Sequence, residues 1–213
     1  MVKLLSYVAT FDGGIYRVKK GKGKGAVNCQ FIMNMRESNL DYVEWVASVI
    51  REITGVRITS RKDYNKDGHK RSPQVRLESN RHPLLTRLHE RIYMDGHKVI
   101  DPHMLKMMDA EALAIIFMAD GSTYLDTRFR KPHAKITLET KGFSYADNMA
   151  LSKAIYKATG IRTNVHRSGT YYLLYVKAAD HALFVETVKP YIFPSFLYKL
   201  ERIAPALSGG VVI

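Results

Sequence analysis

The chain has 213 residues, enough for one large domain or for two halves of roughly 100 residues each that share a core. It has one cysteine, Cys29, so it can form neither an intramolecular disulfide nor a zinc site of several cysteines. This cysteine content favours a reducing intracellular compartment, cytoplasmic or organellar. Lysine and arginine number 33 against 20 aspartates and glutamates. The resulting charge of +13 predicts a polyanionic partner, with nucleic acid preferred over an acidic membrane surface.

Membrane association is not expected from the hydropathy pattern. No apolar run approaches the roughly 20 residues of a membrane span, and the first residues lack the long apolar segment of a signal peptide. The basic residues also lie largely in alternating or turn segments, whereas a membrane surface favours basic amphipathic helices.

The first half of the chain predicts paired strands between helices. The expected elements are a helix over residues 3–12, strands over 15–20 and 26–34, a helix from Ser38, strands over 56–61 and 73–78, and a helix over 82–94. Ser38 and Asp41 have the spacing of a capping box, and Gly55 is expected to end the helix that Ser38 begins. A turn rich in glycine and lysine separates the first two strands.

The second half predicts the same order of elements. They are a helix from Asp109 to Gly121, strands near 123–130 and 133–140, a helix from Ser144, strands over 161–167 and 171–177, and a helix over 179–189. Ser144 and Asp147 repeat the capping box, and Gly160 repeats the helix stop. We therefore predict an α+β fold of two pseudo-symmetric αββαββα halves, residues 1–100 and 101–213, with the boundary near Asp101 and Pro102.

Each half contains an apolar helix that leads into an aspartate and a glycine. The acids are Asp12 and Asp120, and a carboxylate at the last turn of a helix opposes the helix dipole unless a positive charge neutralises it. The small residues within the helices would let them pack side by side and bring the two acids together, and these residues are Ser6, Ala9, Ala114 and Ala119. Two carboxylates at short distance favour a bound divalent metal. The alternative is ordinary turn chemistry of an Asp-Gly pair, which a single copy would not exclude.

The same two segments resemble a known signature. Leu113 and Ala114 with Ala119, Asp120 and Gly121 match the first two and last three positions of LAGLIDADG, and the first copy matches at Leu5, Asp12 and Gly13. Over nearly its whole length the chain resembles the single-chain, two-motif LAGLIDADG homing endonucleases. The resemblance implies antiparallel sheets that form a DNA-binding saddle, with the motif helices at the interface between the halves.

The resemblance also implies site residues. In that family the final aspartate of each motif binds metal and a lysine from each half lies in the cleavage pocket; carried over, these are Asp12, Asp120, Lys98 and Lys199. Two residues before each acid stands Thr10 or Met118, where the signature has an acid. For the two lysines, an ordinary surface location is the alternative.

Phosphodiester hydrolysis needs an activated water and neutralisation of negative charge at the phosphate, which metals shared by two carboxylates supply. Mg²⁺, or Mn²⁺, is the expected cofactor because oxygen ligands suit it. With both motifs in one chain, we expect a monomer that cuts double-stranded DNA at a long, asymmetric site.

Alternating strands predict the residues that read this DNA. Arginine, lysine, asparagine and glutamine side chains read base edges in the major groove, where a two-stranded ribbon fits. The candidates are Arg17, Lys19, Asn28, Gln30, Arg57, Thr59, Arg61, Gln74, Arg76, Lys135, Thr137, Arg162, Asn164 and His166. The alternative is that these residues form ordinary solvated sheet faces.

Two other functions remain open. One is an intron RNA maturase, and the other is a DNA-binding regulator that kept the fold and lost catalysis. Because a pure binder has no reason to retain both Asp12 and Asp120, the sequence favours the nuclease.

Overall fold

The computed structural model describes residues 2–17, 28–61, 72–127 and 133–207. The chain divides into two compact units, Met1–His97 and Lys98–Ile213, and each is described by itself. The domain boundary expected at Asp101 and Pro102 stays a prediction.

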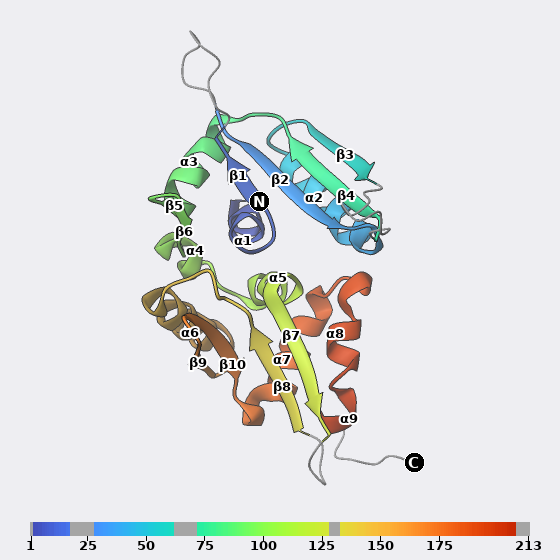
Figure 1. Ribbon diagram of the computed structural model, residues 1–213, viewed down its shortest axis with the longest axis vertical. Helices are drawn as coiled ribbons and strands as arrows, with labels where there is room; N and C mark the ends of the chain where they lie inside the picture. Colours follow the sequence, from blue (N-terminus) through green and yellow to red (C-terminus); the bar gives the residue numbers. More distant parts are fainter. Residues whose placement is uncertain (1, 18–27, 62–71, 128–132, 208–213) are drawn as a thin grey trace. The chain divides into compact units, whose positions relative to one another are not determined.

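The first unit contains a four-stranded antiparallel sheet with strand order β1-β2-β4-β3 (Figure 1). In chain order its elements are α1 (Val2–Phe11), β1 (Gly14–Tyr16), β2 (Gln30–Arg36), the 3-10 turn η1 (Glu37–Asn39), α2 (Leu40–Arg51), β3 (Val56–Arg61), β4 (Gln74–Ser79) and α3 (Pro83–Ile92). A short hairpin of β5 (Tyr93–Met94) and β6 (His97–Lys98) then leads into the second unit.

The second unit repeats this arrangement, with strand order β7-β8-β10-β9. Its elements are α4 (Pro102–Lys106), α5 (Ala110–Asp120), β7 (Gly121–Asp126), β8 (His133–Leu138), α6 (Tyr145–Thr159), β9 (Thr163–Ser168), β10 (Tyr171–Val176), η2 (Ala178–Asp180), α7 (His181–Val188), η3 (Lys189–Tyr191), η4 (Pro194–Phe196), α8 (Tyr198–Glu201) and α9 (Ala204–Leu207). The predicted α+β class and the αββαββα order are confirmed, with α1 to α3 forming one copy and α5 to α7 the other.

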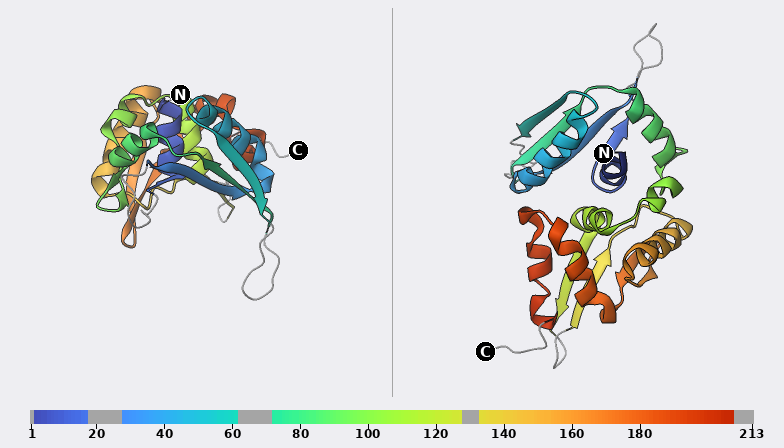
Figure 2. Two further views of the ribbon diagram at one scale, coloured as in Figure 1. Left: turned by 90° about the horizontal axis from the view of Figure 1, so that it is seen from above. Right: turned by 180° about the vertical axis from the view of Figure 1, so that it is seen from behind.

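In each unit the helices cover one face of the sheet, as Figure 2 shows from above. The covered face is apolar because alternate strand residues point toward the helices. In the first unit these buried residues are Phe31, Met33, Val75 and Leu77, and in the second they are Ile136, Leu138, Leu174 and Val176. The other face of each sheet, called here the outer face, carries the residues between them.

The two signature helices are buried along most of their length. In α1 every residue from Leu5 to Phe11 is buried, and in α5 every residue from Ala112 to Met118. A helix that is apolar on all sides belongs inside a protein, so these segments position the residues that follow them. None of the helices in the described ranges is long and apolar enough to cross a membrane.

The helix boundaries confirm the predicted caps in the second unit only. Asp109 caps α5, and the Ser144 and Asp147 capping box begins α6, which ends at Gly160 with a positive φ of 74°. The predicted capping box at Ser38 and Asp41 is wrong. A 3-10 turn occupies Glu37–Asn39, so α2 begins at Leu40 without a side-chain cap. Gly55 is also not the helix stop, because α2 ends at Arg51.

Some strand ends differ from the predicted ones. The strand β1 covers only Gly14–Tyr16, and the glycine- and lysine-rich turn after it lies outside the described residues. The strand β9 begins at Thr163, so Arg162 precedes the strand instead of belonging to it. The helix expected over 179–189 is split into a 3-10 turn and α7.

Candidate active site and nucleic-acid interface

Asp12 follows the last residue of α1, and a buried phenol orients its carboxylate. The hydroxyl of Tyr42, on α2, donates a hydrogen bond of 2.6 Å to Asp12 Oδ2. Burial is the main cause that raises the pKa of Tyr42 well above its usual value, and the Asp12 charge and this hydrogen bond raise it further. Tyr42 therefore remains protonated near neutral pH and holds the carboxylate in one orientation.

The residue after each acid must be glycine, because a side chain at that position would not fit. A Cβ atom on Gly13 would collide with the ring of Phe31, and one on Gly121 would collide with the ring and main chain of Phe117. The φ of Gly121 is −79°, a backbone conformation that any residue can adopt. Only the close packing against Phe117 requires glycine at this position. Ordinary turn chemistry, the alternative for the Asp-Gly pairs, does not account for this packing.

Asp120 is the last residue of α5 and lies in a charged environment within the second unit. Burial raises the pKa of its carboxyl to about 6 against the opposing effects of Lys98 and Lys199, and the nearby Glu139 raises it further. The N–H of Glu139 donates to the main-chain oxygen of Asp120 at 2.7 Å, and the Glu139 carboxylate pairs with Lys141 at 2.6 Å. The structure thus brings together three of the predicted residues, Lys98, Asp120 and Lys199.

Lys199 has a second role that the sequence did not indicate. Its side chain is only 8% exposed, and Nζ donates to the main-chain oxygens of Phe117 (3.1 Å), Met118 (2.7 Å) and Gly121 (2.8 Å). An ammonium group has three donors, and the last carbonyls of a helix lack partners within the helix. Lys199 therefore caps the carboxyl end of α5. Lys98, in β6, is half-buried.

Carboxylate oxygens of this kind suit Mg²⁺, which binds through one or two carboxylates together with substrate phosphates and water. Within the described ranges no group of three or more histidine, cysteine, aspartate or glutamate side chains is placed to hold a metal ion. Asp12 and Asp120 belong to different units, so their predicted proximity stays a prediction, as does the helix packing expected at Ser6, Ala9, Ala114 and Ala119.

The outer face of the first sheet is polar, as the alternation predicted. Register pairs Arg57 with Glu78 and Thr59 with Arg76, which puts these residues on one face, together with Gln74 two positions before Arg76. Gln30 opposes Tyr16 on the same face. Lys19 and the side chain of Arg61 lie outside the described residues.

Two candidates lie beside this sheet and contact α3. Arg17 is exposed and pairs with Glu90 at 3.2 Å. Asn28 accepts a hydrogen bond from the Thr86 hydroxyl at 3.2 Å.

The predicted DNA-reading residues of the second unit differ in how exposed they are. Lys135, Asn164 and His166 are exposed, and the ring of His166 packs against Tyr175 with centroids 4.6 Å apart. Thr137 lies on the outer face, where it pairs with Ser122 and Tyr175, and its predicted DNA contact stays a prediction. It is 8% exposed, and its hydroxyl donates to Glu139.

Arg162 is held by an acid of its own unit. Its guanidinium donates to both carboxylate oxygens of Asp180, from Nε at 2.8 Å and from Nη2 at 2.6 Å, and its main-chain N–H also donates to Asp180 at 2.8 Å. This contact connects the start of β9 to the start of α7. Its predicted DNA contact stays a prediction.

The sequence reasoning missed several outer-face residues. Asn34 and Arg36 are exposed on β2, where the alternation from Gln30 onward would have identified them. Exposed tyrosines Tyr16, Tyr124 and Tyr171 lie on other strands. Tyr42 and Glu139 have no comparable signal, because their contacts to the two acids depend on the fold.

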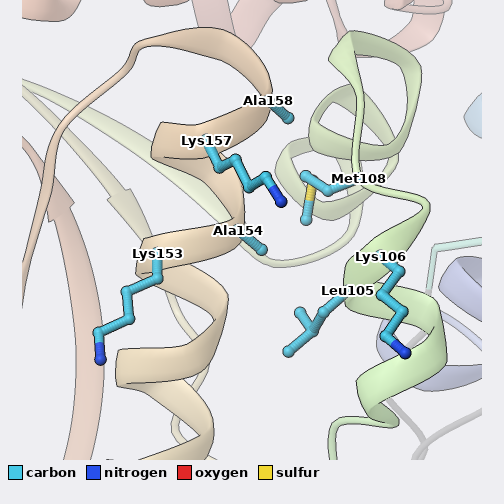
Figure 3. A pocket seen from close by; sticks show the side chains of 7 residues that line it. All are labelled: Leu105, Lys106, Met108, Lys153, Ala154, Lys157 and Ala158. Carbon is cyan, nitrogen blue, oxygen red and sulfur yellow. The ribbon is translucent and has the colours of Figure 1, made fainter.

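A separate hollow of about 370 Å³ lies between α4 and α6 in the second unit (Figure 3). Its lining residues are Leu105, Lys106, Met108, Lys153, Ala154, Lys157 and Ala158. Lys106 and Lys153 point away from one another, and none of the predicted site residues lines this hollow. It is therefore distinct from the acids and from the outer faces.

The comparisons with known proteins agree with this architecture. The probable intron-encoded endonuclease 1 of Wickerhamomyces canadensis is 24% identical over 177 residues, which cover 81% of this chain and 74% of that protein. The structure of the homing endonuclease I-WcaI bound to its DNA recognition sequence has a TM-score of 0.74 at 22% identity and covers 93% of this chain and 85% of its own. A variant of I-DmoI, solved with nicked target DNA in the presence of manganese, has a TM-score of 0.52 at 16% identity, covering 88% and 93%.

These structural similarities establish the fold. The family model described as the LAGLIDADG DNA endonuclease family matches residues 12–184, from the first signature acid to α7. With this match over most of its length, the chain belongs to the LAGLIDADG DNA endonuclease family.

Proposed function

We propose that this protein is a site-specific endonuclease that hydrolyses both strands of duplex DNA, with divalent metal bound by Asp12 and Asp120. One observation carries the proposal beyond family membership. The carboxylate of Asp120 lies at the end of a buried signature helix, in the field of Lys98 and Lys199. Burial and the helix dipole both make an ionised carboxylate unfavourable at this position. Asp120 therefore does not stabilise the fold as an ionised group, and metal binding accounts for its presence.

A divalent cation held by the carboxylates of Asp12 and Asp120 would supply an activated water and neutralise charge at the phosphate. The protein's own residues prepare the site. Tyr42 fixes the orientation of the Asp12 carboxylate through its 2.6 Å hydrogen bond. Lys199 caps α5 and so holds the main chain on both sides of Asp120. Lys98, which is half-buried, stabilises negative charge that develops on a phosphate beside Asp120.

The outer faces of the two sheets are the proposed DNA contact surfaces. They carry the arginine, asparagine and glutamine side chains that read base edges, and the chain's charge of +13 favours the phosphate backbone. I-WcaI, whose fold is similar, has been solved bound to its recognition sequence. Because the side chains of the two units differ, we expect a long, asymmetric target site and a monomeric protein.

The test begins with selection of preferred duplexes from a randomised DNA library, with Ca²⁺ present to support binding. The selected duplex is then incubated with the protein and Mg²⁺ or Mn²⁺. We expect double-strand cleavage at one position, and we expect Asp12→Asn and Asp120→Asn to abolish it while binding persists. Selective binding without cleavage under any divalent metal would favour the regulator. Selection of structured RNA in preference to duplex DNA would favour the maturase.

A further inference from the structure

Among the residues that the structure describes, the outer face of the first sheet contains one acid, Glu78, although the proposed partner is a polyanion. Glu78 lies on β4 directly opposite Arg57 of β3, and Arg76 lies two residues before it on the same face. These strands are neighbours in the sheet (Figure 1). An uncompensated carboxylate on this face would repel phosphate, so its presence in the sheet needs a physical reason.

Glu78 forms an ion pair with each of the two arginines. Its Oε1 accepts from Arg76 Nη2 at 2.8 Å, and its Oε2 accepts from Arg57 Nη2 at 3.0 Å. Each carboxylate oxygen thus serves a different guanidinium. The hydrogen bond from Arg76, and then that from Arg57, lowers the pKa of Glu78, so the carboxylate stays ionised. A further contact joins Arg76 Nη1 to Asn34 Oδ1 at 3.4 Å.

The two arginines keep donors that are available to a ligand. A guanidinium has five N–H donors, and Glu78 engages one nitrogen of each. The Arg57 side chain is 73% exposed, against 26% for Arg76 and 23% for Glu78. Arg57 and Glu78 also line a hollow of about 640 Å³ together with Gln30, Ser79, Asn80 and Arg81. The Arg57 side chain therefore extends into open space while one of its nitrogens is bonded to the Glu78 carboxylate.

We propose that Glu78 is a specificity-determining positioning residue, which holds Arg57 and Arg76 in the orientation that reads base edges of the target. This inference rests on the proposed function. A long arginine side chain loses rotamer freedom when it binds, and a partner that orders it beforehand reduces that loss. Phosphate contacts tolerate varied side-chain positions, whereas a bidentate contact to a guanine needs one orientation. Glu78 thus favours the correct sequence over other sequences, at the expense of general affinity for DNA.

Two substitutions separate orientation from charge. Glu78→Asp keeps the charge but shortens the side chain, so one carboxylate no longer reaches both guanidinium groups. Glu78→Gln removes the charge and replaces one acceptor with a donor. The matched control is Glu44→Gln, an equal charge change at an exposed position on α2, whose buried side faces the sheet. Thermal unfolding of each variant checks that the fold is retained.

The measurement is the dissociation constant for the selected duplex and for a scrambled duplex of equal length, with Ca²⁺ present. We expect Glu78→Asp and Glu78→Gln each to lower the ratio of specific to non-specific affinity about tenfold, which is the scale of ordering one or two side chains. Glu78→Gln should also tighten binding to the scrambled duplex, and Glu44→Gln should leave the ratio unchanged. Base preference should be lost at the same base pairs that Arg57→Ala and Arg76→Ala affect.

The proposal is overturned if Glu78→Asp keeps the wild-type ratio, or if Glu78→Gln changes both affinities equally. It is also overturned if loss of preference falls on a single base pair that neither arginine variant affects, because Glu78 would then contact a base itself. Should Glu78→Gln fail to fold, Glu78→Asp decides. Failure of the proposed function looks different, since the wild-type protein would then either show no preference among duplexes or bind the selected duplex without cutting it.

Discussion

Replacing Asp120 by asparagine should have opposite effects on activity and on the stability of the metal-free protein. Cleavage should be abolished because the metal-binding charge is lost. The unfolding free energy in the presence of a chelator should rise at neutral pH, because the fold of the second unit disfavours the ionised carboxyl. Its pKa is raised from 3.8 to about 6 when the protein folds.

The size of this gain follows from the pKa shift. At about 1.36 kcal/mol per pKa unit, ionised Asp120 lowers the unfolding free energy by about 1–3 kcal/mol. The upper value follows from the full pKa shift, and the lower value allows for partial exposure. A carboxyl with a raised folded pKa stabilises the fold at low pH and loses that contribution as pH rises through the folded value. The advantage of Asp120→Asn should therefore be absent below pH 3.8, develop up to about pH 6 and remain constant above.

Thermal unfolding with a chelator at pH 4 and at pH 7.5 measures both variants. We expect Asp120→Asn to raise Tm by about 3–9 °C at pH 7.5 and to change it little at pH 4. Asp12→Asn is the matched control. Its carboxylate accepts a 2.6 Å hydrogen bond from buried Tyr42, so the substitution should bring no gain. A lower Tm for Asp120→Asn at pH 7.5, or an equal change at both pH values, would refute the reasoning.

The remaining predictions concern the residues around the acids and the DNA surface. Lys199→Met should lower the unfolding free energy by roughly 3 kcal/mol, because buried carbonyls at the end of α5 lose the hydrogen-bond donor that Lys199 provides. Lys98→Met should instead slow single-turnover cleavage with little change in Tm. Tyr42→Phe should slow cleavage of one strand more than the other, so that nicked DNA accumulates on a gel, and equal slowing of both strands would argue against it. Affinity for DNA should fall steeply with salt, with a logarithmic slope of about −0.9 per neutralised phosphate, and a flat dependence would remove DNA as the partner. Sedimentation should give the mass of a single chain, and a stable dimer would contradict the two-motif layout.

Local signals predicted much of the fold. The strand alternation and the caps at Asp109, Ser144 and Gly160 depend on residues close in sequence, and the structure confirms them. The capping box at Ser38 failed for a local reason as well. The 3-10 turn over Glu37–Asn39 moves the helix start to Leu40, and the Asp41 carboxylate accepts from the N–H of Tyr42 instead.

The candidate site was predicted less completely, because its contacts join distant parts of the chain. The motif identified Asp12 and Asp120, but no periodicity connects Tyr42 to the first or Glu139 to the second. The position of Glu78 between two arginines depends on strand register, which is set when β3 and β4 pair. Register is determined by the packing of the whole sheet, so a single strand's sequence does not specify which residues face each other.

The cap on α5 has a consequence for synthesis of the protein. Lys199 bonds carbonyls at Phe117, Met118 and Gly121, which a ribosome adds roughly 80 residues earlier. At about 5–20 residues per second, several seconds pass between synthesis of the end of α5 and synthesis of Lys199, which donates the hydrogen bonds to it. A nascent chain that already contains both signature acids still lacks the group that holds Asp120 in place. The surroundings of the second acid are therefore complete only after Lys199 has been synthesised.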